Sequence, residues 1–174
     1  LLSRRQRQMC IRDRRYPLAD GSGEVIIATT RPETMLGDTG VAVSPKDPEK
    51  AAFVGKTVKL PIVDREIPIF EDWHVDANFG SGFVKVTPAH DPNDYAMGQA
   101  HDLPQINIFD EHAVVVEGYG EFTGMTREEC REAVIKWFDE HGLLDHVEEH
   151  DHSVMHCYRC DAALEPWLSE QWFV

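Results

Sequence analysis

The segment Phe79–Tyr95 (FGSGFVKVTPAHDPNDY) constrains the fold more than any other stretch, because it combines a Gly-x-Gly turn, a short strand and a loop bounded by prolines. Gly80 and Gly82 allow backbone angles that other residues avoid, and they let another part of the chain approach closely. A strand that buries the two valines of this run aims Lys85 and Thr87 together at its opposite face. The segment therefore predicts a turn and then a strand with a polar end.

A helix start follows this strand. Pro88 and Pro92 interrupt the strand pattern, and Asp91 or Asn93 is expected to cap a helix that begins at Pro92. A polar loop between a strand end and a helix N-terminus is a common place for a binding site, and His90 lies in this loop. The alternative is a strand, a turn and a capping aspartate without a ligand, with His90 bonded to its own loop. This segment alone leaves both interpretations open.

A second strand also ends in polar residues. The β-branched run Glu24–Thr29 predicts a buried strand, and Pro32 stops it. Taken together, the two strand ends supply cations, hydroxyls and carboxylates, but no nucleophile beside a base. That combination suits holding a polar ligand and orienting water, whereas the alternative is two separate solvated strand ends. The candidate residues for a shared site are Thr29, Thr30, Arg31, Thr34, Lys85, Thr87, Asp91 and Asp94.

The remaining pattern predicts a mixed α/β fold. Thr126 and Glu129 form a capping box that starts a helix, and Pro68 suggests that its strand lies at a sheet edge. Further strands are expected at residues 39–44, 55–61, 65–70, 106–109, 113–116 and 143–147, and helices at 45–53, 92–101 and 126–141.

Composition narrows the class of protein. The 174 residues carry a net charge of −14, which disfavours broad nonspecific binding to nucleic acid but does not exclude one local nucleic-acid site. No apolar run is long enough to span a membrane, and no signal-peptide pattern is present. We therefore expect no membrane partner. Of the four cysteines only Cys157 and Cys160 are closely spaced, which is not the pattern of a disulfide scaffold, so we expect a cytoplasmic location.

Residues 1–14 (LLSRRQRQMCIRDR) differ from the chain that follows, because they are basic and keep no strand or helix period. One interpretation is a basic arm for RNA. The other, which we favour, is a segment that is not native to the protein or is disordered, because it resembles translated adaptor sequence. We therefore leave these residues out of the expected fold.

Cys157 and Cys160 have the spacing of zinc ligands, but they form only one pair where four ligands are needed. His152 or His156 would have to join them, or the other ligands would lie outside this chain. The interpretations are half of a zinc knuckle, which we favour, or two idle thiols. Cys130 lies on the expected 126–141 helix and is assigned to packing.

Two motifs, Ala28–Asp38 (ATTRPETMLGD) and Gly80–Asp94 (GSGFVKVTPAHDPND), resemble the editing domain of valyl-tRNA synthetase. This domain is the insertion in class I aminoacyl-tRNA synthetases that hydrolyses mischarged tRNA. The resemblance runs from about Tyr16 to Val174 and includes HSVMHCYRC at 152–160 and EPWLSEQWFV at 165–174. Two departures are Gly40, where a bulkier strand residue is expected, and Met155, where Gly is expected.

The resemblance implies a small β-barrel-like domain with peripheral helices, in which the two polar strand ends meet. It implies that the substrate is the 3′ end of valine tRNA carrying misattached threonine. Editing would need no cofactor. ATP would be used only by the longer parent enzyme, because this sequence contains no ATP-site signature. The remaining domains of that enzyme would be partners.

The resemblance also assigns roles. Asp94 would bind the substrate ammonium, while Asp91, Thr87 and Lys85 would recognise the threonine hydroxyl. Arg31 and Thr34 would position the ester and the terminal ribose. The remaining substrate-binding candidates are Thr29, Thr30, Phe79, which would stack on adenine, Gly80, Gly82 and His90, and Glu33 and Asp38 are assigned to structure.

The chain is accordingly divided into residues 1–14, an editing domain at 15–148, and a zinc-knuckle half with a return segment at 149–174. The competing hypotheses are a non-catalytic fragment that binds tRNA ends or zinc, which the acidic charge favours, and a free-standing editing enzyme. The uncapped apolar run at 172–174 disfavours the free-standing enzyme.

Overall fold

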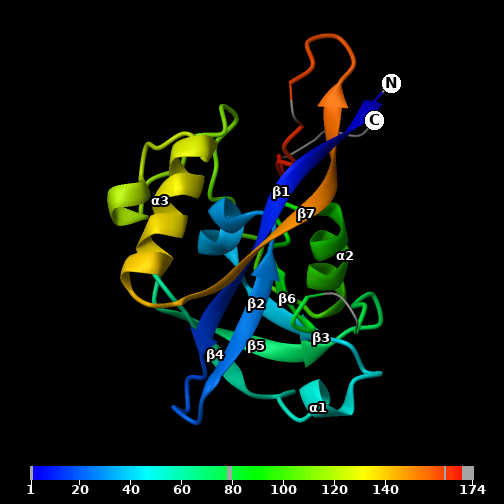
Figure 1. Ribbon diagram of the computed structural model, residues 1–174, viewed down its shortest axis with the longest axis vertical. Coiled ribbons are helices and arrows are strands. Elements are labelled where there is room, and N and C mark those ends of the chain that lie inside the picture. The colour runs from blue at the N-terminus through cyan, green and yellow to red at the C-terminus, as the bar shows by residue number, and fades with distance from the viewer. Residues whose placement is uncertain (1, 78–79, 163, 170–174) are drawn as a thin grey trace.

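The computed structural model describes residues 2–77, 80–162 and 164–169, with side chains left undescribed at 2–12 and 146–155. Its strands form two sheets (Figure 1). The first has the order β2-β1-β7, and the second has the order β4-β5-β3-β6. The first sheet comprises β1 (Leu2–Pro17), β2 (Glu24–Thr29) and β7 (Leu144–Cys157), and the second comprises β3 (Gly40–Val43), β4 (Thr57–Leu60), β5 (Arg65–Glu71) and β6 (Phe83–Val86).

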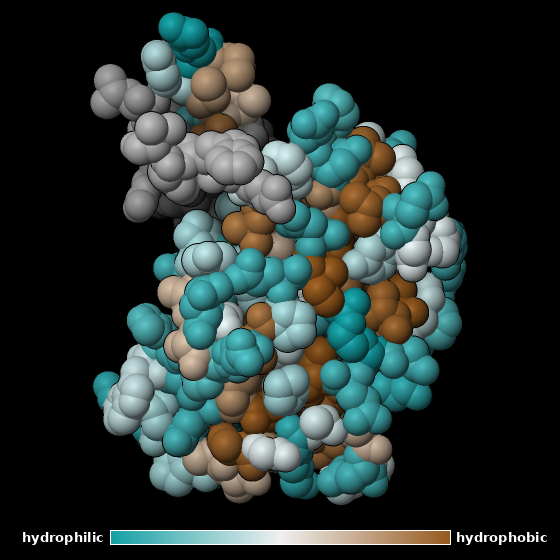
Figure 2. All heavy atoms as spheres, turned by 180° about the vertical axis from the view of Figure 1, so that it is seen from behind, coloured by the Kyte–Doolittle hydropathy of each residue, from teal (hydrophilic) through white to brown (hydrophobic). Residues whose placement is uncertain are grey.

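The two sheets share one main hydrophobic core. β2 and β6 lie next to each other across the sheets, and an isolated bridge joins Leu18 to Val58. The largest fully buried apolar side chains of this core include Tyr16, Ile27, Ile67, Ile69, Ile108 and Phe138. Hydrophobic side chains reach the face shown in Figure 2 in small groups separated by hydrophilic ones. The described residues contain no helix long and apolar enough to cross a membrane.

The helices begin where the sequence supplies caps. Asp91 caps α2 (Pro92–Ala100), since its carboxylate accepts from the backbone N–H groups of Asn93 and Asp94. The capping box of Thr126 and Glu129 starts α3 (Arg127–Glu140), as predicted. In Figure 1, α2 and α3 flank the β1–β7 ribbon on opposite sides. The shorter helical elements are η1 (Pro32–Gly37), α1 (Pro48–Ala51) and η2 (Gly120–Phe122).

The mixed α/β class is confirmed, but the described strands stay in two sheets and do not close into a barrel. The expected strands at 106–109 and 113–116 are wrong, because only isolated bridges form there, from Phe109 to Val115 and from Val114 to Thr126. The edge position expected from Pro68 is also wrong, since β5 lies between β4 and β3. Pro68 is tolerated because pairing with β3 begins one residue later, at Ile69.

The basic segment at the N-terminus differs from the expected disorder. The backbone of β1 pairs with β7 from Leu2 onward and with β2 from Arg12 onward. Backbone hydrogen bonds to its long partner β7 hold this strand. Such bonds do not require that apolar and polar side chains alternate along the sequence. That residues 1–14 are not native stays a prediction. β7 also runs without a break through the proposed domain boundary at 148/149.

The unexpected glycine of β3 has a packing reason. A Cβ atom on Gly40 would lie 2.6 Å from Cε1 of Phe70 and 3.1 Å from Cδ1 of Leu103. Phe70 lies on the neighbouring strand β5, so its ring occupies the space that a bulkier residue on β3 would need. The other departure, Met155, lies among the undescribed side chains.

Gly98 gives a test of how α2 packs on the Pro88 loop. A Cβ atom there would lie 2.7 Å from Cγ and 2.9 Å from Cβ of Pro88, a rigid ring. Gly to Ala in an open helix stabilises by about 1 kcal/mol, but here we expect Gly98→Ala to destabilise by about 1–3 kcal/mol, measured by urea unfolding. The control Gln99→Ala, exposed on the same helix, should stay within about 0.5 kcal/mol. A stabilised Gly98→Ala variant would contradict this packing.

Candidate functional site

A cavity of about 530 Å³ opens where β2 and β6 end. It brings the two polar strand ends together, as the resemblance implies. Its wall also contains residues that were not predicted, among them Val75, Asn93 and Met97. The predicted site residues that line it are Thr29, Thr30, Arg31, Thr34, Lys85, Thr87, His90, Asp91 and Asp94.

Lys85 is the centre of a buried polar network in the cavity wall. The residue is 8% exposed, and its Nζ lies 2.9 Å from Oγ1 of Thr34 and 3.4 Å from Oδ1 of Asp38. It also donates to Oγ1 of Thr87, which in turn donates to Oδ1 of Asp38 at 2.7 Å. Tyr16 completes the network by donating to Oδ2 of Asp38 at 2.8 Å.

The hydrogen-bond directions in this network are fixed by chemistry. An ammonium has three N–H donors, and Lys85 directs them to Thr34, Asp38 and Thr87. A carboxylate and a carbonyl only accept, so the Thr87 hydroxyl points its proton at Asp38 and the Thr34 hydroxyl points its proton at the carbonyl of Arg31. Each hydroxyl therefore keeps acceptor capacity for a ligand, whereas Lys85 has no donor left over.

Asp38, which the resemblance assigned to structure, is a central member of this network. It is fully buried, and burial raises the pKa of its carboxyl while the Lys85 ammonium opposes that rise. Its backbone is held as well, because Nη1 of Arg65 donates to its carbonyl at 3.0 Å. Charge balance was the available signal, since a buried lysine needs a buried carboxylate beside it.

Asp94 faces the same cavity from the first turn of α2. It is 9% exposed, and its Oδ2 accepts from the backbone N–H of Thr87 at 2.8 Å. Burial raises the pKa of this carboxyl to about 6, although Lys85 opposes the rise. A buried carboxylate with a raised pKa in a cavity is a typical feature of a functional site. Asp91 lies beside it and serves as the helix cap.

Arg31 and His90 tie the two strand ends together. Nη1 of Arg31 donates to the carbonyl of His90 at 2.8 Å, and Nε contacts Oε1 of Glu33 at 3.5 Å. The His90 ring is buried, and its Nε2 accepts from the backbone N–H of Ile108 at 3.0 Å. Burial lowers the pKa of His90 to about 4, so the ring is neutral and its acceptor nitrogen is occupied. His90 is therefore not poised as a general base.

The glycines of the predicted turn do not line the cavity. Gly80 has φ of +55°, and a Cβ atom there would lie 2.5 Å from Cβ of Ala28, so this glycine lets the loop approach β2. Gly82 has φ of +80° and faces Lys50 and Asp47 near α1. Phe79, the predicted adenine contact, lies outside the described residues.

The cysteine pair fits half of a metal site. The backbone N–H of Cys160, and after it that of Arg159, bond to the thiol of Cys157 and lower its pKa, as suits a thiolate ligand. The described residues contain no group of three or more ligands, so these side chains would supply only part of a zinc site. His152 has no described side chain, whereas Nδ1 of His156 bonds to the carbonyl of Asp161 at 2.7 Å. A zinc ion at Cys157 and Cys160 stays a prediction.

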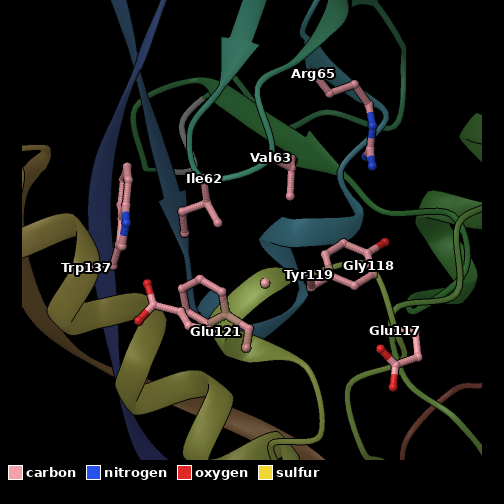
Figure 3. A pocket seen from close by; sticks show the side chains of 10 residues that line it. Ile62, Val63, Arg65, Glu117, Gly118, Tyr119, Glu121 and Trp137 are labelled. Carbon is pink, nitrogen blue, oxygen red and sulfur yellow. The ribbon is translucent and has the colours of Figure 1, made fainter.

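A second cavity of about 560 Å³ lies between the β4–β5 turn, the loop around η2 and α3. Figure 3 shows Trp137 and Tyr119 at opposite sides of it, with Ile62 and Val63 between them. This cavity contains none of the predicted site residues. The polar network and the raised pKa of Asp94 therefore make the first cavity the candidate site.

Known proteins share this fold and sequence. The family model described as the leucyl-tRNA synthetase editing domain matches residues 46–139. Valine–tRNA ligases of Thermotoga maritima and Geobacillus stearothermophilus are each 55% identical over 160 residues, which is 92% of this chain and 18% of each ligase. The chain thus spans about a fifth of the length of these relatives.

Solved structures agree in fold. A leucyl-tRNA synthetase of Agrobacterium radiobacter K84, in a ternary complex with tRNA and LeuAMS, matches 92% of this chain and 24% of its own with a TM-score of 0.62 and 19% identity. The domain GlLeuRS-CP1 matches 73% of this chain and 84% of its own with a TM-score of 0.59 and 16% identity.

The fold and the family match define the class of protein. The chain belongs to the editing domains of class I aminoacyl-tRNA synthetases. Within this class, its sequence is that of an editing domain of the valine–tRNA ligase type.

The Lys85–Asp38 pair can be tested through stability. Asp38→Asn would leave the buried ammonium without its counter-charge, so we expect a loss of about 3–5 kcal/mol in the free energy of urea unfolding. The double variant Asp38→Asn with Lys85→Met removes both charges. It should be more stable than the sum of the single losses predicts, by at least about 1 kcal/mol. Additive losses would show that the two charges do not interact.

Asp94 should make stability depend on pH. Because its pKa is about 6 in the folded protein and 3.8 in the reference state, the native form holds the extra proton, and stability falls as pH rises from about 4 to about 6. Asp94→Asn should remove this loss. Between pH 4.5 and 7.5 its free energy of unfolding, measured in urea, should rise by about 1–3 kcal/mol relative to that of the parent. The exposed control Asp139→Asn should show no such gain, and a parallel pH dependence of the Asp94 variant and its parent would contradict the burial argument.

Proposed function

We propose that this domain hydrolyses the ester between misattached threonine and the 3′ adenosine of valine tRNA. The observation that carries the proposal is the cavity wall in which Thr87, Thr34 and the buried Asp94 lie close together around Lys85. Such a wall suits an amino acid with an ammonium and a side-chain hydroxyl better than one with an apolar side chain.

The need for this chemistry follows from the shapes of valine and threonine. They have nearly equal volume, so an apolar synthetic pocket cannot strongly reject an amino acid that merely adds a hydroxyl. A polar cavity has the opposite preference and favours threonine over valine. A threonine hydroxyl can donate to the spare acceptor positions of Thr87 or Thr34, whereas a valine methyl in the same place would gain no hydrogen bond from them.

We assign the substrate ammonium to Asp94. A cation entering beside this carboxyl would favour its ionised form and lower its pKa from about 6, so binding and ionisation would support each other. Asp91 keeps its capping bonds through Oδ1, which leaves its other oxygen for the side-chain hydroxyl or for water. The roles of both aspartates remain proposals.

Hydrolysis would rest on orientation rather than on a histidine base. His90 is neutral, but its Nε2 already accepts from Ile108, so water must be positioned by other groups. Arg31 lines the cavity and carries N–H donors suited to the ester and the terminal ribose, whose own hydroxyl would help to activate water. Thr34 holds the backbone carbonyl of Arg31 in place.

The setting of this reaction is also proposed. The tRNA end and the remaining domains of a longer ligase would be its partners, and the cytoplasm its location. Any use of ATP to activate valine would belong to those other domains. The competing function is a module that binds the tRNA end without hydrolysing it, which the net charge of −14 favours by weakening long-range attraction for RNA.

Deacylation of threonyl-tRNA for valine tests the proposal. We expect the chain to release threonine faster than valine, with a rate that rises as pH increases through about 6, because Asp94 must be ionised to hold the ammonium. Asp94→Ala should lower the rate at least about a hundredfold at pH 7.5. The control Gln99→Ala, exposed on α2 and outside the cavity lining, should retain activity. Binding without release of threonine by the parent chain would favour the competing function, and equal rates for the parent and Asp94→Ala would exclude the role of Asp94.

A further inference from the structure

Glu165 joins the candidate site from the far end of the chain. One oxygen of its carboxylate pairs with Nη2 of Arg31, and the other pairs with Nη1 of Arg127 on α3. All three side chains are three-quarters or more buried, with exposures of 25% for Glu165, 22% for Arg31 and 23% for Arg127. Exchange with water is limited there, so these pairs are stronger than ordinary surface ion pairs.

The segment that carries Glu165 is held at further points. The backbone of Pro166 bonds to the His90 ring, and the carbonyl of Leu168 accepts from Nδ2 of Asn107 at 3.1 Å. His90 is the residue whose carbonyl receives Nη1 of Arg31. Glu165 and Pro166 therefore contact both strand ends of the candidate site, through Arg31 on one side and His90 on the other.

These contacts fix the Arg31 guanidinium but occupy only part of its N–H donors. A guanidinium has five N–H donors, and three of them go to described partners, namely His90, Glu33 and Glu165. The group is planar, so three partners in different directions set its orientation as well as its position. Two donors remain without a partner among the described residues, and Arg31 lines the cavity.

We propose that Glu165 is a positioning residue that holds the Arg31 guanidinium in the orientation needed to bind the ester and terminal ribose of the substrate. The inference rests on the proposed editing function for the identity of the ligand. The pairing itself does not depend on that function. Arg127 is the second anchor, because it holds the other oxygen of Glu165 and stops the carboxylate from turning away.

The test uses the whole chain and a threonyl amide of 3′-amino-3′-deoxyadenosine, which cannot be hydrolysed as an ester. We expect Glu165→Gln to weaken its binding about tenfold in calorimetry and to raise KM more than it lowers kcat in deacylation. Arg31→Gln should weaken binding similarly, and adding Glu165→Gln to it should cost little more. Glu165→Asp should recover part of the affinity, because it restores the charge at a shorter reach.

Glu128→Gln is the matched control. Glu128 pairs with the same Arg127, but its side chain is 67% exposed and it does not line the cavity. This variant should bind the amide like the parent chain. Equal binding by Glu165→Gln, in a protein that still loses binding on Asp94→Ala, would overturn the positioning role and leave the editing function standing.

A second measurement separates the inference from that function. In urea unfolding, each single variant raises the equilibrium constant for unfolding by some factor. The combined Arg31→Gln and Glu165→Gln variant should raise it by a factor at least about fivefold smaller than the product of those two factors, since each single change already breaks the pair. If the parent chain neither binds nor hydrolyses, this coupling still shows whether Glu165 holds Arg31. Independent effects of the two substitutions would overturn the inference whatever the activity.

Discussion

The buried pair of Lys85 and Asp38 is the interaction on which the candidate site depends. Removing two charges from water costs several kcal/mol per ion, and only good geometry with further hydrogen bonds offsets that cost. Asp38 accepts such bonds from Thr87 and Tyr16, and Lys85 donates them to Thr34 and Thr87. The polar wall is thus built before any ligand arrives, so its hydroxyls need little reorganisation on binding.

Sheet register creates this pair. β3 and β6 run antiparallel, with Gly40 opposite Val86, and the N–H of Thr39 donates to the carbonyl of Val86 at 3.0 Å. Asp38 lies immediately before Thr39, and Thr87 lies immediately after Val86, so the Thr87 hydroxyl can donate to the Asp38 carboxylate. Tyr16 reaches the same carboxylate from the first sheet, which links the site to the main core.

The sequence predicted the local elements well where a cap or a β-branched run was present. The strands at Glu24–Thr29 and Phe83–Val86 and the capped helix α3 are confirmed. Its local pattern gave Glu165 no role, because the partners Arg31 and Arg127 lie far away in sequence, and only charge balance around a buried Lys85 pointed to Asp38. The segments 106–109 and 113–116 do pair with each other, but through backbone bonds too few to form strands, and local pattern does not reveal how far a pairing extends. The roles of the site residues in catalysis remain predictions.

The β3–β6 register also restricts how such a domain can change during evolution. A shift of one residue in either strand would turn Lys85 away from Asp38 and place a valine in the polar wall. Insertions and deletions between Asp38 and Val43, or between Phe83 and Thr87, would therefore be selected against even when the side chains of the site are retained. Length changes can instead accumulate in exposed turns away from these two strands, such as the one at Gly21 that joins β1 to β2.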